Sequence, residues 1–124
     1  MGNEPMRCGV IGVGRMGRHH ARVYAQLDGV ELVGVVDRDP DRRAAITEEW
    51  GGVGFETAAE LLDAGVDAVT IATPTIYHRE AAEIMLEAGV ACLIEKPLAQ
   101  TADEAAALVE LSERTGTTLQ VGHV

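Results

Sequence analysis

Residues 12–17 read Gly-Val-Gly-Arg-Met-Gly and lie between an apolar strand-like run and a helix-like run. In this setting Gly12 permits a tight turn, Gly14 lets the backbone approach a pyrophosphate, and Gly17 lets the helix pack closely on the strand. The free amides at the start of the helix, expected over Arg15–Asp28, would face that pyrophosphate. With 14 glycines in the chain such a pattern arises easily by chance, so its meaning depends on the surrounding sequence.

Strand-like and helix-like segments alternate along the whole chain. We expect strands at Arg7–Gly12, Glu31–Asp37, Val53–Phe55, Asp67–Ala72, Ala91–Glu95 and Thr118–His123. Helices are expected to start near Arg15, Pro40, Thr57, Thr75 and Thr101. Continuous apolar runs such as Leu-Val-Gly-Val-Val at 32–36 are typical of strands covered on both faces. The sequence therefore predicts a single α/β domain over residues 1–124, with a doubly wound, mostly parallel Rossmann-type sheet and helices on both faces.

The expected helix ends carry their own signals. Thr57-Ala-Ala-Glu60 and Thr101-Ala-Asp-Glu104 match the capping box, in which a hydroxyl and a carboxylate satisfy free amides at a helix start. Glycines that suit a left-handed cap follow the helices at Gly29, Gly51, Gly65, Gly89 and Gly116. Within the first helix, a face containing Met16, His20, Val23, Tyr24 and Leu27 predicts that His20 is packed and hydrogen-bonded at the edge of the core.

Composition and charge exclude several classes of function. The net charge of −10 argues against nucleic acid and anionic membranes as partners, because both would repel the chain. The longest apolar runs are too short to span a membrane, and the N-terminus lacks the layout of a signal peptide. Cys8 and Cys92 lie in predicted strands and suit small buried apolar positions, and no His, Cys or Asp cluster has metal-ligand spacing. We therefore expect a cytoplasmic, reducing location and no metal.

Asp37 lies 20 residues after Gly17, at the end of the second predicted strand. A carboxylate there accepts hydrogen bonds from the adenosine ribose and repels a 2′-phosphate, so NAD is predicted, with NADP less favoured. Arg38, Arg42 and Arg43 keep NADP open, because guanidinium groups accommodate a 2′-phosphate, and Asp37 also suits a simple turn role. The cofactor contacts expected from these two segments are Gly12, Val13, Gly14, Arg15, Met16, Asp37 and Arg38.

Two further motifs follow later strands. Ala72-Thr73-Pro74-Thr75-Ile-Tyr-His78 comes after the fourth, and Glu95-Lys96-Pro97 comes after the fifth, about 80 residues beyond the Gly-rich loop. With that loop and Asp37, they make the chain resemble, over essentially its whole length, the N-terminal NAD-binding Rossmann domain of the glucose–fructose oxidoreductase/inositol dehydrogenase (Gfo/Idh/MocA) family. Glu-Lys-Pro is the most specific part. The ending at 120–124 is similar to the branches that oxidise nucleotide-linked amino sugars.

The resemblance implies roles for these motifs. Lys96 would be catalytic, contacting the reacting hydroxyl and the nicotinamide ribose and assisting proton removal, which suits an ammonium beside a developing alkoxide. Glu95 would orient that ribose, and the Lys96–Pro97 peptide would be cis. Thr73 and Pro74 are expected beside the cofactor, while His78 either approaches the cofactor or caps its helix. Without the other motifs, residues 95–97 are better interpreted as an ordinary strand exit with solvated charges.

The function implied is that of the cofactor-binding domain of an NAD(P)-dependent oxidoreductase. Such an enzyme takes a hydride from a sugar, nucleotide-sugar or cyclitol hydroxyl. In the family a second domain supplies the substrate pocket and an acid–base pair; nothing in this sequence matches it, so we expect the chain alone to lack catalysis. The alternative is a standalone NAD-binding, sensing or interaction module. Lys96 favours the enzyme, because a sensor needs only the Gly-rich loop and Asp37. A homo-oligomer is compatible with both.

Overall fold

The computed structural model describes residues 4–122, which form a parallel six-stranded sheet with helices between the strands. The strands are β1 (Met6–Ile11), β2 (Val30–Val36), β3 (Val53–Phe55), β4 (Ala68–Ile71), β5 (Ala91–Glu95) and β6 (Leu119–Gly122), in the order β3-β2-β1-β4-β5-β6. The helices are α1 (Arg15–Gln26), α2 (Pro40–Trp50), α3 (Ala58–Ala64), α4 (His78–Glu87) and α5 (Ala102–Thr115). The predicted Rossmann-type fold is confirmed. His123, the predicted end of the last strand, lies outside the described residues.

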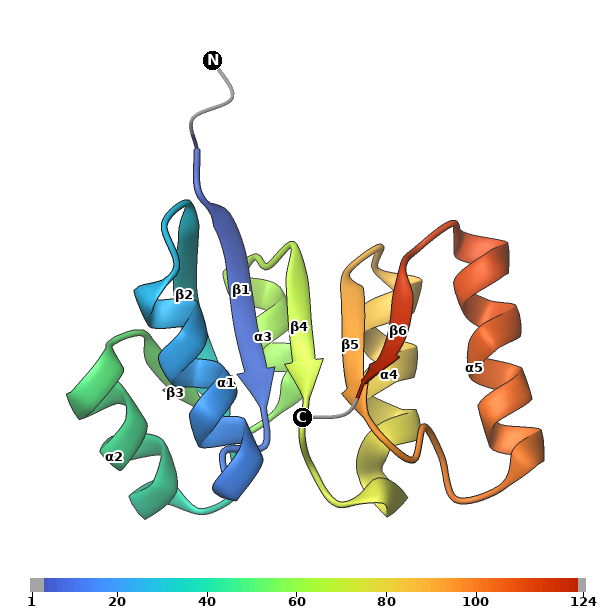
Figure 1. Ribbon diagram of the computed structural model, residues 1–124, viewed down its shortest axis with the longest axis horizontal. Helices are drawn as coiled ribbons and strands as arrows, with labels where there is room; N and C mark the ends of the chain where they lie inside the picture. Colours follow the sequence, from blue (N-terminus) through green and yellow to red (C-terminus); the bar gives the residue numbers. More distant parts are fainter. Residues whose placement is uncertain (1–3, 123–124) are drawn as a thin grey trace.

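Helices cover both faces of the sheet (Figure 1), and α1 lies in front of it while α3 and α4 lie behind. Neighbouring strand residues point to opposite faces, so Val10 and Val35 pack under α1 and α2 while Ile11 and Val36 pack under the other helices. This arrangement explains the continuous apolar runs in the sequence, because both faces of each central strand are buried.

The buried face of α1 differs from the predicted one. Val23 and Leu27 are 36% and 48% exposed, and the buried residues of the helix are Gly17 and Ala21. The Tyr24 hydroxyl reaches into the sheet, 2.6 Å from Thr70 Oγ1. Small residues let the helix axis lie close to the strands, so the contact face follows the glycine and alanine rather than the larger apolar side chains.

The helix ends follow their sequence signals. The capping box at Thr57 and Glu60 is present in both directions, and the Thr101 side chain accepts a hydrogen bond from the Glu104 amide. All five predicted glycines have positive φ, between 67° and 91°, and Gly116 is a left-handed cap as predicted. Gly51 and Gly65 also follow their helices directly, but their ψ angles of −167° and 101° lie outside the left-handed helical region, so that part of the prediction was wrong for them. The fourth helix is the exception: residues 75–77 form a 3₁₀ turn, η1 (Thr75–Tyr77), in which the Tyr77 amide donates to the Pro74 carbonyl at 2.9 Å. The α-helix therefore begins at His78, one turn later than predicted.

The two cysteines are buried, free thiols, as predicted. Burial raises the pKa of Cys92 to about 12, and burial followed by the charge of Asp67 raises that of Cys8. Among residues 4–122, no helix is long and apolar enough to cross a membrane.

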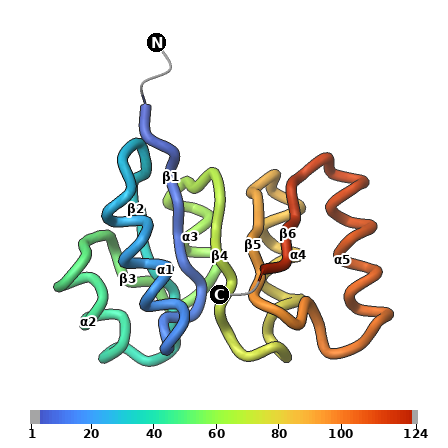
Figure 2. The backbone as a smooth tube through the Cα atoms, in the orientation of Figure 1, coloured from blue at the N-terminus to red at the C-terminus, as the bar shows by residue number. Residues whose placement is uncertain are grey.

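The strand order locates the candidate site. From β1 the chain builds outward to β3, and it then crosses through α3 to β4 on the other side of β1 (Figure 2). At such a switch point the loops leaving β1 and β4 diverge, and a crevice opens at the carboxyl ends of the strands. The Gly-rich loop leaves β1 at this point, and the Thr73–Pro74 segment leaves β4 beside it.

Candidate cofactor-binding site

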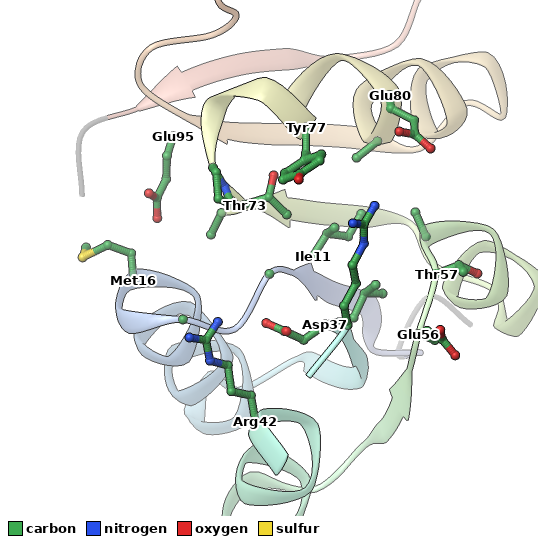
Figure 3. A pocket seen from close by; sticks show the side chains of 18 of the residues that line it. Ile11, Met16, Asp37, Arg42, Glu56, Thr57, Thr73, Tyr77, Glu80 and Glu95 are labelled. Carbon is green, nitrogen blue, oxygen red and sulfur yellow. The ribbon is translucent and has the colours of Figure 1, made fainter. Parts of the chain in front are cut away.

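A cavity of about 710 Å³ lies at the carboxyl edge of the sheet, a volume ordinary for a small-molecule site. Four segments predicted to contact a cofactor line it together: Gly12, Gly14, Arg15 and Met16 after β1, Asp37 and Arg38 after β2, Thr73 and Pro74 after β4, and Glu95 at the end of β5. Figure 3 shows Glu95 and Met16 at one end of the cavity and Thr57 and Glu56 at the other, with Asp37 between them. The cavity is therefore elongated across the switch point, as an extended dinucleotide requires.

Three predicted site residues lie outside the cavity lining. Val13 is fully buried, and its amide donates to Asp37 Oδ2 at 3.0 Å. His78 is buried behind the β4 loop, where its imidazole faces backbone carbonyl oxygens. Lys96 is exposed and follows Glu95 directly, and the Lys96–Pro97 peptide is cis, as predicted. The structure thus places these three around the cavity rather than on its wall.

The three motif glycines meet different requirements. A Cβ at Gly17 would lie 1.7 Å from the Gly12 carbonyl oxygen, so helix and loop could not both stay in place. Gly12 has φ +90°, and a Cβ there would lie 2.8 Å from the Thr73 amide nitrogen. At Gly14 a Cβ would meet nothing within 4 Å, although the residue lines the cavity. The protein itself does not require a glycine at 14, which leaves the space beside it for a ligand.

This contrast gives a matched pair of variants. Gly14→Ala should unfold within about 5 °C of the wild type, because it loses only the N-cap preference for glycine over alanine, about 1 kcal/mol. It should bind NADH about tenfold or more weakly, because the new Cβ fills the place of the pyrophosphate. Gly17→Ala should lose about 3 kcal/mol or more of stability through overpacking. Thermal unfolding and NADH titration of both variants check this. Equal NADH affinity in Gly14→Ala and wild type would place the phosphates elsewhere.

Asp37 has, in the structure, the turn role that the sequence left open for it. Its Oδ2 accepts the Val13 amide and its Oδ1 accepts the Asp39 amide at 2.9 Å, so the carboxylate fixes the Gly-rich loop against the turn after β2. It also lines the cavity, and each carboxylate oxygen has a further lone pair for a ribose hydroxyl. Of the neighbouring arginines, Arg42 lines the cavity, whereas Arg43 donates to the Asp37 carbonyl at 3.0 Å.

Polar atoms without partners mark the other end of the cavity. Thr73 Oγ1 and Glu95 Oε1 are buried and have no hydrogen-bond partner among residues 4–122, and both residues line the cavity. Buried polar groups are nearly always hydrogen-bonded, so these atoms point to a ligand that supplies hydroxyl or amide groups. The ribose and carboxamide of a nicotinamide nucleotide fit that requirement.

His20 belongs to the same end. Its Nε2 lies 3.7 Å from Glu95 Oε1 and makes no hydrogen bond to any residue that the structure describes, so the predicted hydrogen bond is missing at this nitrogen. Burial, and then the charge of His19, lower the pKa of His20, so the imidazole is neutral at pH 7 and the contact is not an ion pair. Burial raises the pKa of Glu95, while the charge of His78 opposes that rise. His20 Nε2 and Glu95 Oε1 therefore form a polar contact, and both atoms can still form hydrogen bonds to a ligand.

The raised pKa of Glu95 leads to a pH-dependent prediction. Because the folded pKa exceeds the unfolded value of about 4.5, folding favours the protonated carboxyl, and this stabilisation is lost as pH rises through the folded pKa. Glu95→Gln, which cannot ionise, should raise the melting temperature at pH 7 and leave it unchanged at pH 4. Its NADH affinity at pH 7 should fall about tenfold or more, because a charged acceptor is replaced by a neutral one. A lower melting temperature at pH 7 would contradict the assignment.

Several lining residues were not among the predicted contacts. They are Ile11, Val36, Glu56, Thr57, Ala58, Ala59, Ala72, Tyr77, Glu80, Ala81 and Ile84. Tyr77 lies inside the quoted Thr73–His78 motif, and the Arg38 guanidinium lies 5.0 Å from its ring centroid. Thr57 was predicted only as a helix cap, but it also lines the cavity. Most of the others lie on α3 and α4. No local motif marks them, because they reach the cavity only through the way in which the chain crosses from one side of the sheet to the other. Among residues 4–122, no group of three His, Cys, Asp or Glu residues is placed to hold a metal.

Residues 6–123 match the family described as "Oxidoreductase family, NAD-binding Rossmann fold", Gfo/Idh/MocA. The chain belongs to this family and is a nicotinamide-dinucleotide-binding Rossmann domain, which confirms the resemblance stated from its motifs.

Three proteins illustrate what the chain is similar to. It is 44% identical over 119 residues to the UDP-N-acetylglucosamine 3-dehydrogenase of Acidithiobacillus ferrooxidans, covering 96% of this chain and 37% of that protein; a structure of that enzyme superposes with a TM-score of 0.89. GenD2 from gentamicin A biosynthesis, solved with NAD, gives 0.91 at 32% identity over 96% of this chain and 34% of its own. Biliverdin reductase of Synechocystis sp. PCC 6803, solved with NADP+, gives 0.90 at 29% identity over 96% and 38%. The chain thus spans just over a third of each of these proteins.

Proposed function

We propose that this chain is the cofactor-binding part of an NAD-dependent dehydrogenase that oxidises a sugar, nucleotide-sugar or cyclitol hydroxyl. The observation that carries the proposal is the single cavity joining the Gly-rich loop, Asp37 and Glu95, with Lys96 following immediately. A phosphate loop alone would suit many nucleotides. The Glu95 end adds buried, unpartnered acceptors and an adjacent ammonium, which a site for hydroxyl oxidation requires.

Different residues of the site would contact different parts of the cofactor. The loop at 12–14 and the start of α1 would hold the pyrophosphate, and Asp37 would accept from the adenosine ribose. Thr73 Oγ1 and Glu95 Oε1 would accept from the nicotinamide ribose, since these two atoms have no hydrogen bond among the described residues. Bound NAD supplies the hydride acceptor. The Asp37 carboxylate favours NAD over NADP, because it would repel a 2′-phosphate.

Lys96 would act on the substrate oxygen. As the hydride leaves the carbinol carbon, the hydroxyl proton must also leave, and a carbonyl forms. The ammonium stabilises the developing alkoxide by donating a hydrogen bond to it, and a neutral amine at this position would accept the proton. Lys96 is the only lysine of the chain, so within this domain no second lysine could replace it.

The substrate class rests on the relatives. The Acidithiobacillus enzyme carries UDP-N-acetylglucosamine in its name, so nucleotide-linked amino sugars are the first substrates to test and myo-inositol is the cyclitol comparison. Because the chain spans 37% of that enzyme, we propose that a further domain of the complete protein forms the sugar pocket. A cytoplasmic location is also proposed, supported by the two buried free thiols.

A titration of NADH into this chain, followed by calorimetry or nicotinamide fluorescence, tests the cofactor part. We expect saturable binding below about 1 mM, with NADPH binding more weakly. No binding at that concentration would overturn the proposal. The standalone sensing module makes the same binding prediction, so the two are separated by turnover: the complete protein should reduce NAD with UDP-N-acetylglucosamine or myo-inositol, and a sensor should reduce it with neither.

A further inference from the structure

His78 connects two loops at the edge of the cavity. It is the first residue of α4 and is 1% exposed. Its Nε2 lies 2.8 Å from the Thr73 carbonyl oxygen, and its Nδ1 lies 3.0 Å from the Pro97 carbonyl oxygen and 3.3 Å from that of Leu98. The imidazole therefore touches the segment after β4 on one side and the segment after β5 on the other.

These two segments leave neighbouring strands, since β4 and β5 pair in parallel with Ile71 opposite Ile94. Two residues beyond that pair on each strand, Thr73 lines the cavity and Lys96 begins the turn. The His78 ring lies between the turns that follow. A rigid ring with nitrogens on opposite sides suits this position, because one side chain reaches carbonyl groups of both segments. Both partners are carbonyl oxygens, so a neutral imidazole donates to only one segment, and tying both segments requires the imidazolium, which donates at both nitrogens.

The backbone around Lys96 is held from both directions. The Lys96 amide donates to the Gly122 carbonyl of β6 at 3.2 Å. The carbonyl of the following residue, Pro97, faces His78 Nδ1. The Lys96 side chain extends from this turn, so the position of its ammonium depends on where the backbone of the turn is fixed.

We propose that His78 is a positioning residue for Lys96: by tying the turn at 96–98 to the Thr73 carbonyl, it fixes the lysine relative to the nicotinamide end of the cavity. This inference rests on the proposed function for the role of Lys96. The contacts of His78 with the Thr73 and Pro97 carbonyl oxygens are present in the protein without a bound ligand. His78 thus acts through backbone carbonyls and touches neither cofactor nor substrate.

The single lysine makes the proposal directly testable. Reductive ¹³C-methylation of this chain labels Lys96 and the terminal amine only, so one lysine resonance reports on the turn. His78→Phe fills the same space without a nitrogen, and Leu108→Ala, in the core under α5, is a control that lowers stability away from the site. We expect the Lys96 resonance to shift or broaden in His78→Phe and to stay as in wild type in Leu108→Ala. An unchanged resonance in folded His78→Phe overturns the proposal.

A second variant covers the case in which His78→Phe does not fold. His78→Gln keeps amide donors that reach one of the two segments, so the Lys96 resonance should lie between those of wild type and a freely mobile lysine. A wild-type resonance in His78→Gln, at full occupancy of the folded state, would overturn the proposal as well.

Kinetics of the complete protein separate this inference from the proposed function. His78→Phe should lower kcat by about 10- to 100-fold, as expected for a displaced catalytic group, with the KM for NAD within about threefold. If the wild-type chain fails to bind NADH, the proposed function fails, but the Lys96 resonance still tests whether His78 holds the turn at 96–98. If the wild type binds and turns over but His78→Phe leaves both resonance and kcat unchanged, the inference alone fails.

Discussion

Lys96→Ala in the complete protein is expected to lower kcat by about 10²- to 10⁴-fold while NADH affinity stays within about threefold, the range for loss of a positioned proton-transfer group. The structure supports an effect on turnover rather than on binding, because Lys96 lies beyond the residues that line the cofactor cavity. Its backbone amide, bonded to the Gly122 carbonyl, is retained in the variant, so the turn should persist.

Lys96→Arg is the matched control. It keeps the positive charge and donor capacity, but a guanidinium does not release a proton near neutral pH. If charge alone matters, Arg restores most of the activity, whereas a proton-transfer role leaves Arg close to Ala. Stopped-flow hydride transfer with fluorescence titration of NADH measures the two quantities separately. Equal losses of kcat and of NADH affinity in Lys96→Ala would contradict the catalytic assignment and make Lys96 a cofactor-binding residue.

Asp37→Asn is expected to have the second largest effect, on the choice between the two cofactors. The amide keeps one oxygen to accept the Val13 N–H, so the Gly-rich loop should remain in place, while the negative charge is lost. Removing one repulsive charge near a 2′-phosphate should narrow the preference for NADH over NADPH by about tenfold or more. Titrations with both dinucleotides measure the ratio.

Two comparisons complete this test. Asp37→Ala also removes the acceptor for the Val13 and Asp39 amides, so it should weaken NADH binding further and lower the melting temperature. Adding Arg42→Ala to Asp37→Asn removes a cation that lines the cavity, and the gained NADPH affinity should then be lost. A parallel decrease of NADH and NADPH affinity in Asp37→Asn would mean that the carboxylate acts only as a turn residue.

The parts of the fold that follow from local sequence were predictable. Capping at Thr57, positive φ at glycines such as Gly116, and the burial of residues 32–36 depend on near neighbours in the chain and were confirmed. The parallel order of the strands followed from the regular alternation, because parallel strands need a crossover between them. The placement of Asp37 beside the Gly-rich loop followed in turn from that order.

The remaining details depend on contacts between distant residues. The buried face of α1 is set by Gly17 against the Gly12 carbonyl, a contact that hydrophobic periodicity does not register. His78 meets the Pro97 carbonyl 19 residues further along, and His20 meets Glu95 across the site. Periodicity placed the first of these on a helix and the second at the core edge, but their partners come from segments that only the tertiary fold brings together.

The two helix layers differ in how firmly they are held. The cluster under α1 and α2 contains few buried side chains, with Ile46 the only buried residue of α2, whereas the cluster under α3, α4 and α5 is much larger. Local unfolding starts where the least apolar surface is buried, so the layer formed by α1 and α2 would open at a lower free energy than the layer formed by α3, α4 and α5. A dinucleotide held at the start of α1 would then suppress the opening of the weaker layer, and part of its binding free energy would be used to order the protein.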